Sequence, residues 1–192
     1  MARPKQENAQ DTRQLALDAV ADLIHLHGYN GVSMNALAKA VGVRKASLYH
    51  HFPDGKEQLV LEMLERMIHH HSTGYREAIE NGASVAERLE AIFHFSQKET
   101  AGLSSIVVDS VRFLSEEHQT HVSALFFENQ YERIRSVLAD GIAVGELREH
   151  DVTLSTWMFL SSMSELGRVT DLEDTNLAKR VVGLFLGGLE RA

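Results

Sequence analysis

Residues 33–52, SMNALAKAVGVRKASLYHHF, form the most informative segment of the chain. It divides into two short helical patterns, at 34–41 and 44–51, around a tight turn. Ala38 is small enough for two helices to cross closely, and Gly42, four residues later, can adopt the positive φ of the turn. The apolar side chains that can face inward are Leu37, Val41, Val43, Leu48 and Phe52. The pattern predicts a helix-turn-helix.

In such a motif the first helix braces the second in the major groove of DNA. Arg44 and Lys45 lie at the start of the second helix, where both can hydrogen-bond the O6 and N7 atoms of guanine. Ser33 can cap the first helix and present its backbone N–H groups to a phosphate. We expect the remaining contacts from Ala46 and Ser47 on the outer face, and from phosphate-binding Tyr49, His50, His51 and Lys56. The alternative is a solvated basic face on an ordinary helical hairpin.

The rest of the chain predicts an all-α protein, because Pro4 and Pro53 are its only prolines. Pairs such as Asp11 with Gln14, Asp54 with Glu57, and Ser84 with Glu87 suit helix starts, and glycines such as Gly28 suit helix ends. The apolar periodicity predicts helices at about 11–27, 34–41, 44–51, 55–80, 84–101, 103–115, 118–144, 151–167 and 174–190. The fourth helix would join an N-terminal domain, 1–56, to a second domain, 57–192.

Charge and composition limit the function. The net charge of −8 argues against a nucleic-acid partner, but residues 1–56 carry seven basic and five acidic side chains, a balance of +2, and the remainder −10. One interpretation is a small basic DNA-binding domain joined to an acidic remainder of the chain. The other is chance variation in surface charge. The chain has no cysteine, which excludes disulfides and thiolate metal sites. We expect a cytoplasmic protein, since neither a signal peptide nor a membrane-spanning stretch is evident.

The N-terminal third resembles the TetR family. Domains of that family carry an apolar first helix, Gly-Tyr, a Thr or Ser cap, and a recognition helix that ends Leu-Tyr-x-His-Phe with a lysine soon after. The matching positions here are Leu15 to Leu26, Gly28-Tyr29, Ser33, Leu48-Tyr49-His50-His51-Phe52 and Lys56. The resemblance implies a transcriptional repressor that binds a palindromic operator as a homodimer. A C-terminal domain would bind a small effector and release the DNA.

Two positions depart from the family pattern. Arg44 stands where a small capping residue is common, which weakens the helix cap and adds a possible base contact. The segment Pro53 to Glu57, PDGKE, is one residue longer than the usual form, which alters the reach of Lys56.

An effector site would lie among the helices at 84–144. Its apolar walls would come from aromatic and aliphatic residues, and its polar contacts from a histidine and two amides. These candidates are Phe93, His94, Ile106, Phe113, Phe126, Phe127, Asn129, Gln130 and Tyr131. Most aromatic side chains at helical spacing belong to a core, so the set defines a region.

TetR-like proteins dimerise through their last two helices, here about 151–167 and 174–190. Leu154, Trp157, Met158 and Leu166 supply apolar surface, and Gly183 with Gly187 would permit close approach. For these glycines, a frayed C-terminal helix is the alternative.

An enzyme would need chemistry that the sequence does not supply. His69 to His71 point about 100° apart on a helix, and His118 with His121 lack a third ligand for a metal. We therefore expect no enzyme, no cofactor and no metal. The alternative to a regulator is a helical adaptor or structural protein that keeps the fold without specific DNA binding.

Overall fold

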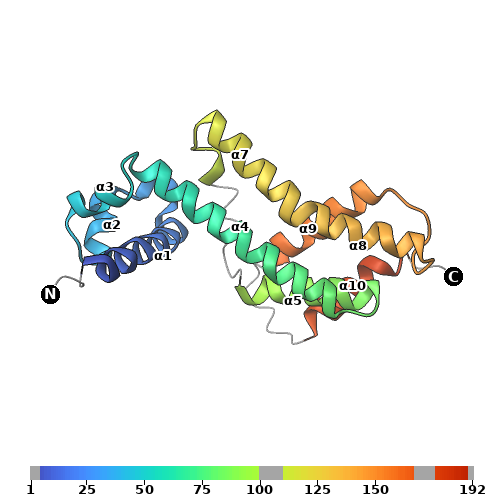
Figure 1. Cartoon of the computed structure of the whole chain (residues 1–192). Coiled ribbons are helices and arrows are strands. Elements are labelled where there is room, and N and C mark those ends of the chain that lie inside the picture. Colours follow the sequence, from blue (N-terminus) through green and yellow to red (C-terminus); the bar gives the residue numbers. More distant parts are fainter. Residues whose placement is uncertain (1–4, 100–109, 167–175, 190–192) are drawn as a thin grey trace. The chain divides into compact units, whose positions relative to one another are not determined.

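The computed structural model describes residues 5–99, 110–166 and 176–189, and the side chains of residues 5–11 and 99 are excluded from the description. Within these ranges the regular structure is helical, with no β-strand (Figure 1). The elements are α1 (Lys5–Gly31), α2 (Met34–Val41), α3 (Lys45–His51), α4 (Lys56–Asn81), α5 (Val85–Glu99), α7 (Glu116–Phe126), the π-helix η1 (Phe127–Tyr131), α8 (Glu132–Ala143), α9 (Val152–Leu166) and α10 (Leu177–Leu186). The all-α prediction is confirmed.

Most predicted helix ends agree with these bounds to within a few residues, and the differences have physical causes. The first helix begins at Lys5, so Asp11 lies inside α1 and the start predicted there is wrong. Gly28 interrupts α1 with φ 67° and ψ 167°, and therefore breaks the regular helix without ending the element. Ser84 does cap α5, because its Oγ accepts the N–H of Glu87 at 3.2 Å.

Two predictions fall between α5 and α8. The helix expected at 103–115 lies mostly outside the described residues. Of its described part, residues 110–111 are helical and residues 112–115 form a turn and bend before α7. The long helix expected at 118–144 is present, but residues 127–131 within it are a π-helix. A π-helix widens one turn and often marks a functional site.

The contacts between residues divide the chain into two compact units. The first comprises Met1–Met67 with Ser105–Ser123, and the second Ile68–Ser104 with Ala124–Ala192. Both α4 and α7 therefore contribute residues to each unit. The predicted boundary after residue 56, between a DNA-binding and an effector-binding domain, stays a prediction.

Each unit has its own apolar core. In the first, α1 contributes Val20 and Ile24, α2 Leu37, α3 Leu48 and α4 Leu59, all buried. In the second, Phe93 of α5 and Phe159 of α9 are fully buried and their ring centroids lie 6.4 Å apart. Burying each large apolar side chain contributes roughly 1.5–3 kcal/mol, so these residues fix how the helices of each unit pack.

Candidate DNA-binding interface

The first helix of the motif, α2, is capped at both ends as the sequence predicts. Ser33 has extended backbone angles, and its Oγ accepts the N–H of Ala36 at 3.1 Å. At the other end Gly42 has φ 75°, and the N–H of Val43 donates to the carbonyl of Ala38 at 2.9 Å. This pattern closes the helix and turns the chain into α3. Only glycine adopts such a φ without strain.

The second helix, α3, buries one face and exposes the other. Leu48 and Phe52, four residues apart, are fully buried, so they anchor α3 against the rest of the first unit. The outer face presents exposed Arg44, Lys45, Ala46, Tyr49 and His50, with Ser47 and His51 half-buried. The structure therefore leaves most of the predicted α3 residues exposed, and only Ser47 and His51 among them are half-buried.

Arg44 is the N-cap of α3, but its side chain makes no capping hydrogen bond. The cap is weak, as the departure from the family pattern predicts, because arginine has no acceptor atom to offer the first N–H groups. The next residue, Lys45, has its Nζ 5.6 Å from the ring centroid of Tyr49, which lies one helical turn further along α3. Both cations remain exposed at the N-terminal end of α3.

His51 lies near two other groups that can carry positive charge. Partial burial lowers the pKa of His51, and His50 and Arg13 lower it further. The imidazole is therefore held toward its neutral form. A neutral imidazole donates one hydrogen bond to a phosphate but adds no charge to the interaction.

The extra residue in the PDGKE segment is accommodated by a turn. The N–H of Gly55 donates to the carbonyl of Phe52 at 2.9 Å, and Gly55 has φ 76°. A Cβ at Gly55 would lie 3.5 Å from the Cε1 atom of Tyr49, which is ordinary contact, so the positive φ is the reason for glycine.

Lys56 has a role that the sequence did not indicate. Its Nζ donates to the carbonyls of Tyr29 at 3.0 Å and Val32 at 3.1 Å, and it lies 3.9 Å from the centroid of the Tyr29 ring. Burial lowers the pKa of Lys56. The ammonium therefore caps the end of α1. The contact of Lys56 with a DNA phosphate stays a prediction, and it would require the ammonium to exchange these hydrogen bonds for bonds to the phosphate.

Two ion pairs join α1 to α4. Arg13 pairs with Glu62, and Arg66 pairs with Asp18 at 2.6 Å. The guanidinium of Arg13 also lies 5.7 Å from the centroid of the Phe52 ring. These contacts hold α1 against the N-terminal half of α4, the helix that follows α3 in the chain.

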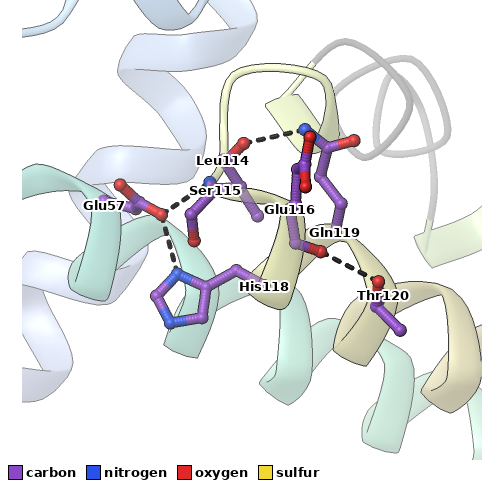
Figure 2. A network of polar contacts seen from close by, with 7 residues as sticks. All are labelled: Glu57, Leu114, Ser115, Glu116, His118, Gln119 and Thr120. Atoms are coloured by element: carbon purple, nitrogen blue, oxygen red, sulfur yellow. Dashed lines mark hydrogen bonds and ion pairs between the residues drawn. The ribbon is translucent and has the colours of Figure 1, made fainter.

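The segment 110–123 also belongs to the first unit. The ring of Phe113 stacks on Tyr29 with centroids 4.9 Å apart and planes inclined by 8°. At the start of α4, the Oε1 of Glu57 accepts the N–H of Ser115 at 2.8 Å and the Nδ1–H of His118 at 2.7 Å (Figure 2). One turn further along α7, His121 donates to Glu65 at 2.7 Å. We call these contacts, made by Glu57 and Glu65 with Ser115, His118 and His121, the α4–α7 clamp.

The clamp also bears on metal binding. His118 and His121 each pair with a different glutamate, so they do not converge on one point. Within the described ranges, no group of three or more His, Asp or Glu side chains could hold a metal ion.

The predicted effector residues do not form one cluster. Phe93 lies in the core, His94 is exposed, Phe113 stacks in the first unit, and Ile106 lies outside the described residues. Phe126, Phe127 and Tyr131 do come together, around Trp157 of α9 at centroid distances of 6.3, 5.8 and 5.2 Å. Asn129 and Gln130 are half-buried beside them in the chain.

Comparison with known proteins identifies the motif. A family model described as bacterial regulatory proteins, tetR family, matches residues 16–63. The HTH-type transcriptional repressor KstR2 of Rhodococcus jostii RHA1 is 31% identical over 185 residues, which cover 90% of this chain and 88% of that protein. The transcriptional regulator LmrA of Bacillus subtilis is 37% identical over 81 residues, which cover 42% of this chain but only 43% of LmrA.

The fold recurs in solved structures. The structure of AibR in complex with isovaleryl coenzyme A and operator DNA superposes with a TM-score of 0.76 at 23% identity, covering 90% of this chain and 97% of AibR. No helix in the described ranges combines the length and the apolar character needed to cross a bilayer. The helix-turn-helix with its buried Leu48 and Phe52, the matched family model and the near full-length relative agree: this chain belongs to the TetR family of DNA-binding transcriptional regulators.

Proposed function

We propose that the protein is a repressor that binds a palindromic operator as a homodimer and releases it when a small effector binds. The observation that carries this proposal is α3, which buries Leu48 and Phe52 and exposes Arg44 and Lys45 at its N-terminal end. Side chains at that end of a recognition helix reach base edges in the major groove. The name of the R. jostii relative, a repressor, supports the direction of control.

The second unit offers a surface for a second copy of the chain. Phe159 of α9 and Phe185 of α10 join the two helices, with ring centroids 5.3 Å apart. Away from this contact α9 exposes Leu154, Trp157 and Met158, and α10 exposes Leu184, at 84%. Four large apolar side chains at the surface of two neighbouring helices favour a protein partner.

Gly183 supports the same surface. A Cβ on Gly183 would meet no atom within 4 Å, and its φ is not positive. Glycine inside a helix costs about 1 kcal/mol relative to alanine, so neither the fold nor the backbone explains it. Close approach of a second copy supplies the reason, and the two-fold symmetry of such a dimer matches a palindromic operator.

The effector would bind in the second unit. AibR, which shares the fold, was solved with a coenzyme A ester and operator DNA together. In this chain the aromatic cluster of Phe126, Phe127, Tyr131 and Trp157 is the part of the predicted effector region that comes together. We propose a small organic effector on this basis.

Effector control would act through α4. This helix is continuous from Lys56 to Asn81, with residues in both units. Its first two residues hold α1 through Lys56 and α7 through Glu57. A shift of α4 would therefore disturb the support of α3. By linkage, an effector that weakens operator binding must itself bind the DNA complex less tightly by the same factor, typically 5- to 150-fold.

Selection of bound sequences from random DNA tests the proposal, repeated with and without a metabolite panel. We expect enrichment of an inverted repeat and loss of binding with one member of the panel. Weak binding with no preferred sequence would contradict the proposal and would favour an adaptor that has kept the fold.

A further inference from the structure

Arg133 on α8 lies in an unusual polar contact inside the second unit. Its Nε and Nη2 atoms both donate to the Oγ of Ser72, at 3.2 and 3.0 Å. Ser72 is buried on α4, and its own hydroxyl donates to the Oδ1 of Asn129 at 3.0 Å. The half-buried guanidinium is thus held by one neutral hydroxyl, which is oriented by a neutral amide.

The charge of Arg133 has no opposite partner in the described part of the chain. Other arginines do have one: Arg13 pairs with Glu62, Arg66 with Asp18, and Arg135 with Glu132. Arginine stays protonated in proteins, and a charge withdrawn from water is costly unless an opposite charge compensates it. Two bonds to one hydroxyl also leave most of the five guanidinium N–H donors available.

The backbone around this group is irregular. Asn129 lies within the π-helix η1, and its Nδ2 donates to the carbonyl of Leu125 at 2.9 Å. Single π-helical turns inside α-helices are rare and occur frequently at functional sites. Here the widened turn carries the amide that orients Ser72, immediately before the helix that carries Arg133.

We propose that Arg133, together with Ser72 and Asn129, binds an oxyanion of the effector, either a carboxylate or a phosphate. This proposal rests on the proposed function, because it names the chemistry of the effector. A planar guanidinium forms paired, charge-assisted hydrogen bonds to either group, and these are stronger than its bonds to a hydroxyl. The aromatic cluster of Phe126, Phe127, Tyr131 and Trp157 lies in the same unit, so we expect the rest of the ligand to be apolar.

The site would also connect the ligand to α4. Ser72 is on α4 and Arg133 is on α8, so an oxyanion that takes hydrogen bonds from the guanidinium competes directly with a contact between these helices. Binding and release of the anion would then change how α8 holds the C-terminal half of α4.

Titration calorimetry on the full chain tests the assignment with three probes: decanoate, decanoyl coenzyme A and the neutral decanol. Arg133→Gln should weaken binding of at least one anionic probe tenfold or more and leave decanol unchanged. Weaker binding of decanoate by Arg133→Gln indicates a carboxylate site. Weaker binding of decanoyl coenzyme A alone indicates a phosphate site. The matched control is Arg135→Gln, two residues along α8, which removes an exposed arginine paired with Glu132 and should bind every probe as the wild type does.

Arg133→Lys keeps the charge but not the paired geometry, and serves if the glutamine variant is unstable. We expect it to bind the anion with intermediate affinity. The proposal is overturned if neither anion binds the wild type, or if Arg133→Gln and Arg133→Lys keep wild-type affinity for both. Operator binding by the unliganded protein is measured in parallel. Its absence would contradict the proposed function, whereas its presence with anion affinity unchanged in both variants contradicts only the Arg133 site.

Discussion

The carboxylate of Glu57 accepts a hydrogen bond from His118 at 2.7 Å, although 61 residues separate them in the sequence. The same oxygen accepts the N–H of Ser115, the residue before α7 (Figure 2). Its neighbour Lys56 donates to the carbonyl of Tyr29, in the last turn of α1, and to that of Val32, just after the helix. The first two residues of α4 thus fasten α1 and α7 to the helix that follows α3.

Acid should loosen the α4–α7 clamp. Hydrogen bonds from Ser115 and His118 hold the pKa of Glu57 below its usual value of 4.5. A depressed carboxyl pKa stabilises the folded state above the unfolded pKa, and this contribution is lost as the pH falls through the folded pKa. The melting temperature of the wild type should therefore fall more steeply below about pH 4.5 than that of Glu57→Gln.

Glu117→Gln is the control for this experiment, because it removes an exposed carboxylate from the first turn of α7, the helix that carries His118. It should keep the acid response of the wild type. An identical pH dependence for Glu57→Gln and the wild type would show that the clamp does not contribute to stability.

Lys56→Met should reduce stability more than it reduces DNA binding. The variant removes two hydrogen bonds from a charged donor to the carbonyls of Tyr29 and Val32, which we expect to lower the free energy of unfolding by about 2 kcal/mol. Because the ammonium is turned to these carbonyls, the salt dependence of DNA affinity should keep its slope. A slope reduced by about one unit, with stability unchanged, would instead identify Lys56 as a phosphate contact.

Arg44→Ala and Lys45→Ala should relax sequence preference. Both side chains are exposed at the start of α3, and each good base contact discriminates against the wrong base by about 1–3 kcal/mol. Competition between operator variants measures the effect at each base pair. Lys98→Ala removes an exposed cation from α5 and should leave every preference unchanged. Equal losses on operator and random DNA for both α3 variants would mean that they contact only phosphates.

Leu184→Glu should dissociate the proposed dimer without unfolding the chain. The side chain is 84% exposed, so the charge has little cost in the monomer and a large one in an apolar interface. Val144→Glu is the matched control, since Val144 is 72% exposed at the end of α8. Analytical ultracentrifugation should find monomers only for the first variant. A dimeric Leu184→Glu protein with normal operator affinity would exclude this surface.

The reading motif was predictable because its signals are local. Ser33, Gly42, Leu48 and Phe52 act within one or two helical turns, so spacing in the sequence determines which side chains cap, turn and pack. The same locality explains why the weak cap at Arg44 could be foreseen.

The clamp and the inward turn of Lys56 were not predictable, because their partners are 24 to 61 residues away. No periodicity indicates that Phe113 stacks on Tyr29, and its aromatic character suited a cavity wall equally well. The π-helix likewise has no signal in the apolar pattern of 118–144, which reads as one regular helix. Contacts over long separations depend on packing that a single sequence does not reveal.

The central proposal is that two copies of α3 bind the two half-sites of one operator. Its most direct test compares the affinity of the full chain for its selected operator with its affinity for the same duplex with one half-site scrambled. We expect the intact operator to bind about 10³-fold tighter or more than random DNA, and the scrambled duplex to lose most of that advantage. The double variant Arg44→Ala/Lys45→Ala should bind both duplexes alike. Equal wild-type affinity for the intact and the scrambled duplex would contradict a dimer that reads a palindrome through α3.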